Sequence, residues 1–291
     1  MRAAALLLLG AALCPARTFY LTVSGLGGEP DYEQRFEGLA AEADKALRAP
    51  ATDADVTTLK GSQATKTAIR ASLDRIARAA AASDVLVVLM IGHGSFDGTD
   101  YKFNIPGPDI SATELAEELN RIPATRQLIV DATSASGAAL KPLARSGRIV
   151  VAATRDGAER NATVFARFWV EALHDNSADT DKNDTVTALE AFRYAQRKTA
   201  DFYTEQQRIA TEHAVIDDIA RAGTFPVVRF GAAAVAAADP AKKSLLSKRD
   251  ELEARIDSLK QQKNVLSPAE YKSQLTGLLI ELARTQQEID K

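Results

Sequence analysis

The sequence predicts an α/β fold with a mainly parallel sheet, followed by a C-terminal α-helical hairpin. Short apolar runs alternate with amphipathic stretches from residue 19 to about residue 231. The run VLVVLMI at 85–91 is apolar without a break, which is typical of a strand covered by helices on both faces. After residue 231 the composition changes and the remaining pattern is helical.

Strands and helices are expected to alternate through the main domain. The strands expected are 19–24, 56–59, 85–92, 127–131, 149–154 and 227–230. The helices expected are 32–47, 63–82, 112–121, 138–145, 163–173, 187–200 and 205–221. The chain has 291 residues, of which 46% are hydrophobic, so it is long enough to bury a sizeable core.

The last fifty residues predict two helices with one apolar seam each. Apolar residues recur at spacings of four and three from Leu245 and again from Tyr271. Between these segments, Ser267 and Glu270 form a capping box with Pro268 at the first helical position. We therefore expect an antiparallel, coiled-coil-like hairpin over 242–291, with 232–241 as a junction. Docking on the main domain, 17–231, is the preferred interpretation, and self-association or a partner surface is the alternative.

The N-terminus has the pattern of a secretory signal peptide. Arg2 precedes an apolar run at 3–13, and Cys14, Pro15 and Ala16 follow it. The run is too short to span a bilayer as a mature helix. We expect 1–16 to be removed by cleavage after Ala16, which leaves an exported chain, periplasmic or secreted, with no membrane span and no thiol.

Composition argues against two further classes of protein. The formal net charge is −3 and no basic block occurs, so nucleic acid is not an expected partner. One Cys and three His that lie far apart do not make a zinc cluster, and no cofactor is required by the expected fold. A protein or peptide is the expected partner.

Two strand ends carry residues that suit chemistry, because parallel α/β sheets form sites beyond the carboxyl ends of their strands. His93 follows one strand and stands between Gly92 and Gly94, a position suited to a general acid or base. The segment VDATSASG at 130–137 runs from another strand into a helix start, where free N–H groups can hold an oxyanion. The alternative is that Thr133 or Ser134 is an ordinary N-cap. An earlier glycine-rich turn at 24–28 lacks the full dinucleotide pattern and predicts a tight turn.

Together these two strand ends resemble the caspase-like cysteine peptidases, and within them the legumain (asparaginyl endopeptidase) family. That family carries a His-Gly motif and, on a neighbouring strand, an acidic-Ala-Cys-x-Ser-Gly motif. The resemblance covers roughly 19–230 and includes the segments 97–109 and 153–169. It implies a three-layer α/β/α caspase-like domain in which His93 is catalytic and the Gly94 backbone donates to the oxyanion.

The sequence departs from the family at the nucleophile. Counting back from Ser136 and Gly137 places the family's Cys on Ser134, whereas anchoring on Asp131 with one inserted residue places it on Thr133. A hydroxyl needs much stronger activation than a thiol, whose ionised form is available near neutral pH. The preferred hypothesis is a degenerate homologue that acts as a binding or scaffold module. The alternative is an active endopeptidase or hydrolase that uses Ser134 with His93 as general base.

Substrate preference is the least defined property. By the same resemblance, Arg155 could face an acidic or amide side chain in the primary pocket. Arg155 is equally consistent with a surface salt bridge to Asp156 or Glu159.

An EF-hand-like pattern occurs at 179–190. Its candidate Ca²⁺ ligands are Asp179, Asp181, Asn183, Thr185 and Glu190. These oxygen donors suit a hard cation, but the sixth position is Asp184, where the sharp turn prefers Gly. The alternative is an acidic loop in which Thr187 caps the next helix and Glu190 completes its capping box.

Overall fold

A six-stranded sheet lies at the centre of the molecule. The computed structural model describes residues 16–49, 54–263 and 265–291, so the expected signal peptide lies outside the described residues except for Ala16. The strand order is β10-β8-β7-β3-β1-β2. The bounds are β1 (Thr18–Ser24), β2 (Ala54–Leu59), β3 (Val85–Ile91), β7 (Arg126–Asp131), β8 (Arg148–Ala152) and β10 (Val215–Ile216). Five strands run parallel and only the edge strand β10 is antiparallel, so the predicted α/β fold with a mainly parallel sheet is confirmed.

The central position of β3 explains why its sequence is apolar throughout. It pairs with β1 on one side and β7 on the other, and all seven of its residues are buried. Alternate side chains enter two separate cores, with Val87 and Leu89 in one and Val88 and Met90 in the other. A strand buried on both faces has no position left for a polar side chain.

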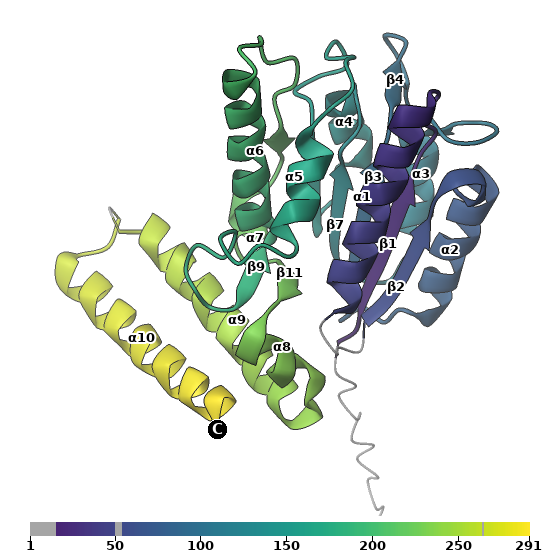
Figure 1. The fold of residues 1–291 in the computed structure, drawn as a ribbon. Helices are drawn as coiled ribbons and strands as arrows, with labels where there is room; N and C mark the ends of the chain where they lie inside the picture. The colour runs from purple at the N-terminus through teal and green to yellow at the C-terminus, as the bar shows by residue number, and fades with distance from the viewer. Residues whose placement is uncertain (1–15, 50–53, 264) are drawn as a thin grey trace, which may run out of the picture.

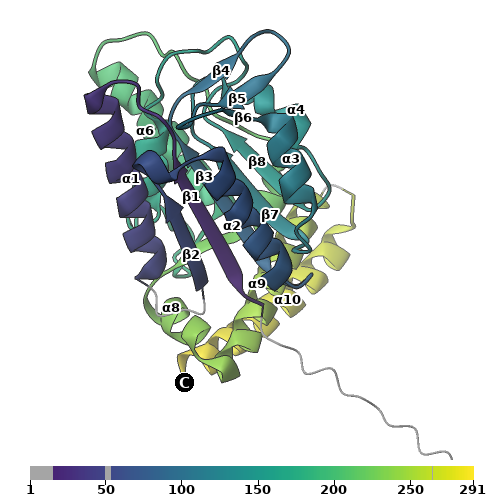
Figure 2. The same ribbon diagram turned by 90° about the vertical axis from the view of Figure 1, so that its right-hand side faces the viewer.

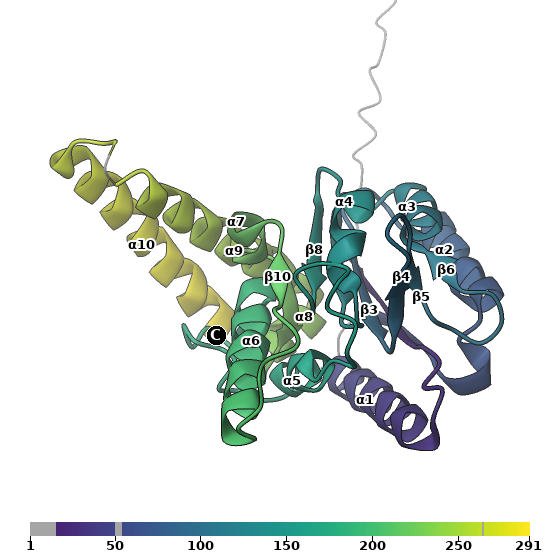
Figure 3. The ribbon, with the colours of Figure 1, turned by 90° about the horizontal axis from the view of Figure 1, so that it is seen from above.

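Helices cover both faces of the sheet. One core contains α1 (Pro30–Arg48), α5 (Phe165–Ala172) and α6 (Ala188–Glu205). The other contains α2 (Lys66–Ala79), α3 (Ala112–Asn120) and α4 (Leu140–Leu143). Seen from above, the two helix groups lie on opposite sides of the strands, so the main domain has three layers (Figure 3).

Two small antiparallel sheets flank the large one. In the first, β4 (Gly94–Phe96), β5 (Tyr101–Phe103) and β6 (Ile110–Ser111) lie over the carboxyl edge of the main sheet (Figure 2). In the second, β9 (Thr185–Thr187) pairs with β11 (Pro226–Arg229). The predicted strand at 227–230 therefore exists, but it lies outside the main sheet. Two short 3-10 turns, η1 (Gly61–Gln63) and η2 (Ser136–Ala139), complete the domain with α7 (Ile219–Ala222).

The helix predicted at 205–221 is wrong. After α6 ends at Glu205, only α7 is helical in this range, and residues 215–216 form β10 on the edge of the sheet. The carboxylate of Glu212 accepts hydrogen bonds from the backbone N–H groups of Val164 and Phe165, at 2.7 and 3.1 Å, and so stabilises the start of α5. These long-range contacts override the local periodicity. The predicted helix at 138–145 is also shorter than expected, because η2 occupies its first turn.

The C-terminal part consists of three helices. α8 (Gly231–Ala238) occupies most of the expected junction, and α9 (Pro240–Gln261) and α10 (Pro268–Asp290) form a hairpin beside the main domain (Figure 1). Leu252, Ile256, Leu259 and Leu278 fill the hairpin seam. Among the described residues, no helix combines the length and apolarity needed to cross a membrane.

One seam residue attaches this hairpin to the main domain. Arg249 of α9 is only 1% exposed. Its guanidinium donates to the Asn183 carbonyl at 2.9 Å and to the Thr185 hydroxyl at 2.7 Å. A charged residue at a seam position therefore bonds to the loop before β9 and to the first residue of β9.

Candidate functional site

The two strand ends singled out in the sequence lie side by side. β3 and β7 are neighbours in parallel register, with Met90 opposite Asp131. The segments that follow them meet where Gly94 approaches Ser134. A Cβ at position 94 would overlap the Ser134 carbonyl and the Thr133 hydroxyl, so only glycine fits there.

Ser134 is bonded to the backbone of Gly94 in both directions. Its hydroxyl donates to the Gly94 carbonyl at 3.1 Å and accepts from the Gly94 N–H at 3.1 Å. The residue is 2% exposed. The Gly94 N–H, expected to stabilise an oxyanion, is therefore directed at the Ser134 hydroxyl.

Thr133, the alternative nucleophile, lies in a buried network. Its hydroxyl is 2.6 Å from the Tyr101 hydroxyl and donates to the Asp131 carboxylate at 2.7 Å. Burial raises the pKa of Asp131 to about 6, and the hydrogen bonds from Thr133 and Tyr101 offset this only in part. Burial also raises the pKa of Tyr101. Because Thr133 and Asp131 are fully buried, this network has no exposed atom to offer a substrate.

His93 is held by a different part of the chain. Its ring makes edge-to-face contacts with the rings of Tyr32 and Phe36 of α1, at centroid separations of 4.9 and 5.1 Å. The imidazole also hydrogen-bonds the backbone of Gly27, in the glycine-rich turn after β1. Partial burial lowers the pKa of His93, the hydrogen bond to Gly27 opposes this in part, and the positive charge of Arg35 lowers the pKa again. Among the described residues, no hydrogen bond joins His93 to Ser134 or Thr133.

The backbone N–H groups of the turn after β7 already have acceptors. The N–H of Thr133 donates to Asp131, that of Ala135 to the Glu159 carbonyl, and that of Gly137 to the Thr154 hydroxyl. Ala135 adopts a left-handed conformation with φ of 56°, which costs a non-glycine residue about 1 kcal/mol. The turn is thus fixed by its neighbours, and these three donors are not free for an oxyanion.

Arg155 lies at the surface beside the same turn. Its side chain is 63% exposed and pairs with Asp156 at 3.6 Å and Glu159 at 3.5 Å. Glu159 also bonds the His213 ring at 2.6 Å, a contact that the sequence did not indicate. The expected salt-bridge partners of Arg155 are present, and its pocket role stays a prediction.

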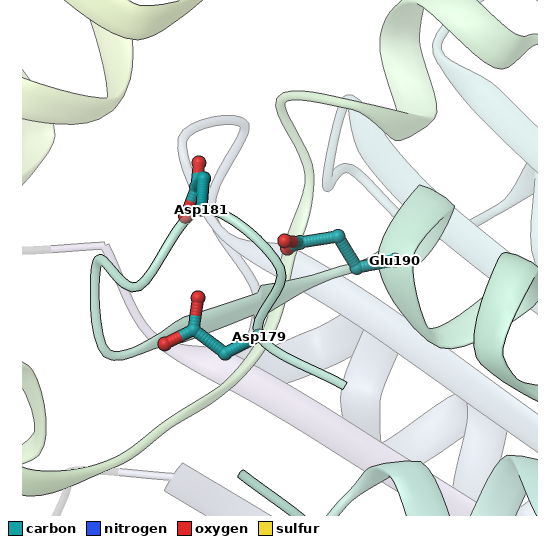
Figure 4. A group of neighbouring side chains, drawn as sticks. All are labelled: Asp179, Asp181 and Glu190. Atoms are coloured by element: carbon teal, nitrogen blue, oxygen red, sulfur yellow. The ribbon is translucent and has the colours of Figure 1, made fainter. Parts of the chain in front are cut away.

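Three of the five candidate metal ligands come together. Ligand oxygens of Asp179, Asp181 and Glu190 lie within 4.8 Å of one another. Glu190 reaches from the start of α6 into the loop that carries the two aspartates (Figure 4). Burial raises the pKa of Asp181 to about 6, with a further rise from the charge of Glu190. These carboxylates are hard oxygen donors that could hold a divalent cation.

The loop also satisfies its own polar groups. Glu190 forms the capping box with Thr187 and accepts two further hydrogen bonds from Thr180. The Asp179 carboxylate accepts the N–H groups of Asn183 and Asp184. The other two candidate ligands have different partners: the Asn183 amide oxygen accepts from the N–H of Thr185, and the Thr185 hydroxyl accepts from Arg249. Both the capping-box interpretation and the carboxylate cluster are therefore realised in one loop.

The solved structures that match this chain include the following two. Protein GSU0716 from Geobacter sulfurreducens is 12% identical, with a TM-score of 0.45 over 75% of this chain and 96% of its own. The Drosophila initiator caspase Dronc is 9% identical, with a TM-score of 0.45 over 70% of this chain and 79% of its own. No family model and no curated protein matches the sequence. Neither structure carries an activity or a site residue over to this chain.

Several contacts of the site were not indicated by the sequence. Tyr32, Phe36 and Gly27 surround His93, and Tyr101 completes the network around Thr133. A weak signal existed for Gly27, because it lies at the carboxyl end of a strand adjacent to β3. No local pattern marks the two aromatic residues, since a helix that covers a sheet needs apolar residues at those positions anyway.

Proposed function

We propose that this chain is an exported, non-catalytic module on a peptidase-like scaffold, and that it acts by binding a protein or peptide. The observation that carries the proposal is that the Ser134 hydroxyl is bonded to Gly94 in both directions, whereas His93 bonds to Gly27. Ser134 thus has a structural partner in place of a catalytic base.

The chemistry of a serine nucleophile supports this view. A serine hydroxyl attacks a carbonyl only when a base within about 3 Å accepts its proton. Here the proton of Ser134 is directed at the Gly94 carbonyl, which is not a base. The N–H of Gly94 is engaged by the same hydroxyl, so activation and oxyanion stabilisation would each require these bonds to break.

A peptide-library digest read by mass spectrometry tests the proposal. Wild type, Ser134→Ala and His93→Ala would be compared, with Ser95→Ala as a matched control on an exposed serine of β4. We expect the four proteins to give the same products as a buffer blank. Cleavage by wild type and Ser95→Ala that disappears in both other variants would contradict the proposal and establish a serine-based hydrolase.

A calcium-dependent interaction module is the second candidate function. The three clustered carboxylates and the raised pKa of Asp181 favour it, because a bound cation would relieve their mutual repulsion. We expect isothermal titration calorimetry with Ca²⁺ to show binding that Asp181→Asn abolishes. Asp100→Asn, which changes an exposed carboxylate in the turn between β4 and β5, should leave binding unchanged. Equal titrations of wild type and Asp181→Asn would exclude this site.

A further inference from the structure

A cavity of about 120 Å³ lies at the amino end of the main sheet, at the opposite edge from Ser134 and His93. Its walls include residues of β1, β2, β3 and β7 of the main sheet, of β11, and of the helices α1, α8 and α9. α8 and α9 lie below this end of the strands (Figure 2). The cavity is thus placed where the C-terminal helices meet the main domain.

Positive charge dominates the polar part of the wall. Arg126, Arg229 and Lys243 line the cavity, and Asp250 is the one carboxylate among the described lining residues. Asp250 lies 2.6 Å from the Arg229 guanidinium and is shared with Arg249 at 3.7 Å. One carboxylate therefore faces several cations.

Arg126 is a lining cation that forms no salt bridge within the described residues. Its guanidinium lies over the Phe225 ring, 5.3 Å from the centroid, and donates to the Thr224 carbonyl at 3.2 Å. Within the described part of the chain it forms no ion pair, and neither does Lys243. Burial lowers the pKa of Arg126, the negative charge of Asp250 opposes this in part, and the neighbouring Arg229 lowers the pKa again. An anion between these side chains would offset both effects.

Much of the rest of the wall is apolar, although Thr18 and Ser247 also line it. Tyr20, Val85, Val227 and Leu246 line it, and the Tyr20 hydroxyl is already bonded to the Val227 carbonyl at 2.7 Å. A dry cavity of about 150 Å³ holds one benzene ring, so this one has room for about six non-hydrogen atoms. That volume excludes a nucleotide and fits a small molecule with one charged end.

We propose that this cavity binds a small aliphatic carboxylate, with its carboxylate held by Arg126 and Lys243 and its alkyl end against Leu246 and Tyr20. A planar guanidinium matches the two oxygens of a carboxylate, whereas a phosphate would leave the apolar wall unused. The site goes beyond the proposed function, because it lies at the other edge of the sheet and shares no residue with Ser134, His93 or Gly94.

Titration of the full chain with butyrate, which has six non-hydrogen atoms, tests the proposal by calorimetry and by the shift in melting temperature. We expect saturable butyrate binding, at least about tenfold weaker in Arg126→Gln and weakened in Lys243→Gln. Arg78→Gln, an exposed arginine of α2, should bind like wild type. Butylamine, which has the same alkyl chain and the opposite charge, should not bind.

Three results would overturn the proposal. They are unchanged affinity in both Arg126→Gln and Lys243→Gln, equal binding of butylamine, and tighter binding of inorganic phosphate than of butyrate. Because Arg126 contacts Phe225 and Thr224, its variant could lose stability. Lys243→Gln keeps the test decisive in that case. Among the described residues Lys243 forms no ion pair, so this substitution breaks none.

Discussion

Ser134 and Gly94 hold each other through two hydrogen bonds of 3.1 Å, one in each direction, although forty residues separate them in sequence. This pair ties the segment after β7 to the segment after β3. The resemblance to caspase-like peptidases predicts a nucleophile and an oxyanion donor at these two positions, but here the two residues are bonded to one another. The Ser134 hydroxyl thus has a structural role.

Ser134→Ala should therefore lower stability without removing an activity. The substitution leaves the Gly94 N–H and carbonyl without their buried partner, at a cost of about 1–3 kcal/mol in the free energy of unfolding. Urea denaturation measures this loss. Ser95→Ala, on the exposed neighbour, should change stability by less than about 0.5 kcal/mol. Equal stability of the two variants would show that the Ser134–Gly94 pair contributes nothing.

His93 should titrate below its usual pKa of 6.5, because partial burial between Tyr32 and Phe36 disfavours the imidazolium. The folded state then binds fewer protons than the unfolded state as the pH falls through 6.5, so this group destabilises the fold on acidification. NMR titration of the His93 ring measures the midpoint. A midpoint above 6.5 would indicate a carboxylate partner and contradict the observed surroundings.

Asp131 should act on stability in the opposite sense. Its folded pKa of about 6 lies above the reference value of 3.8, so its protonation stabilises the fold as the pH falls from 7 to 4. The shift corresponds to roughly 3 kcal/mol. We expect the stability of wild type relative to Asp131→Asn to rise by about that amount over this range, measured by urea denaturation at each pH. A difference that does not vary with pH would contradict the assignment.

Arg249 should control attachment of the hairpin. Arg249→Met keeps the side-chain volume but removes the bonds to Asn183 and Thr185, at a cost of about 2 kcal/mol. Hydrogen exchange should then accelerate in α9 and in the loop before β9. Lys248→Met changes an exposed neighbour whose one ion pair among the described residues is with Glu281, and it should leave exchange unchanged. If both variants exchange like wild type, Arg249 does not hold the hairpin in place.

Cleavage of the proposed signal peptide should strengthen the hydrogen bond between the Arg17 backbone nitrogen and Asp84. The backbone nitrogen of Arg17 donates to the buried Asp84 carboxylate at 2.8 Å, and cleavage after Ala16 would turn that nitrogen into an ammonium group. A charge-assisted bond is stronger than a neutral one. Asp84→Asn should therefore destabilise a chain that begins at Arg17 by about 1 kcal/mol more than the full-length chain. Equal losses in the two chains would mean that the fold does not recognise the new terminus.

The sequence and the structure agree where burial alone decides the pattern. The run at β3 predicts a central strand because a strand buried on both faces tolerates only apolar residues. The helix predicted at 205–221 failed because Glu212 bonds the start of α5 and residues 215–216 pair with β8, and neither contact leaves a local signal. The partners of His93 escaped prediction for the same reason, since Gly27, Tyr32 and Phe36 lie some sixty residues earlier in the chain.

The metal-ligand pattern shows how one motif can satisfy two interpretations. Glu190 completes the capping box that the sequence predicts and also lies beside Asp179 and Asp181. Spacing along the chain brings these groups into one loop, because both a capping box and a Ca²⁺ loop place a glutamate just inside the helix. Only a titration with the cation separates the two.

Labelling with a fluorophosphonate tests the central claim most directly, because this reagent phosphonylates serines that a base has activated. Wild type, Ser134→Ala and His93→Ala would be treated at neutral pH, and peptides that contain Ser134 would be analysed by mass spectrometry. We predict no adduct on Ser134 in native wild type, because its hydroxyl is bonded to Gly94. An adduct on Ser134 that disappears in His93→Ala would contradict the account and establish a catalytic dyad.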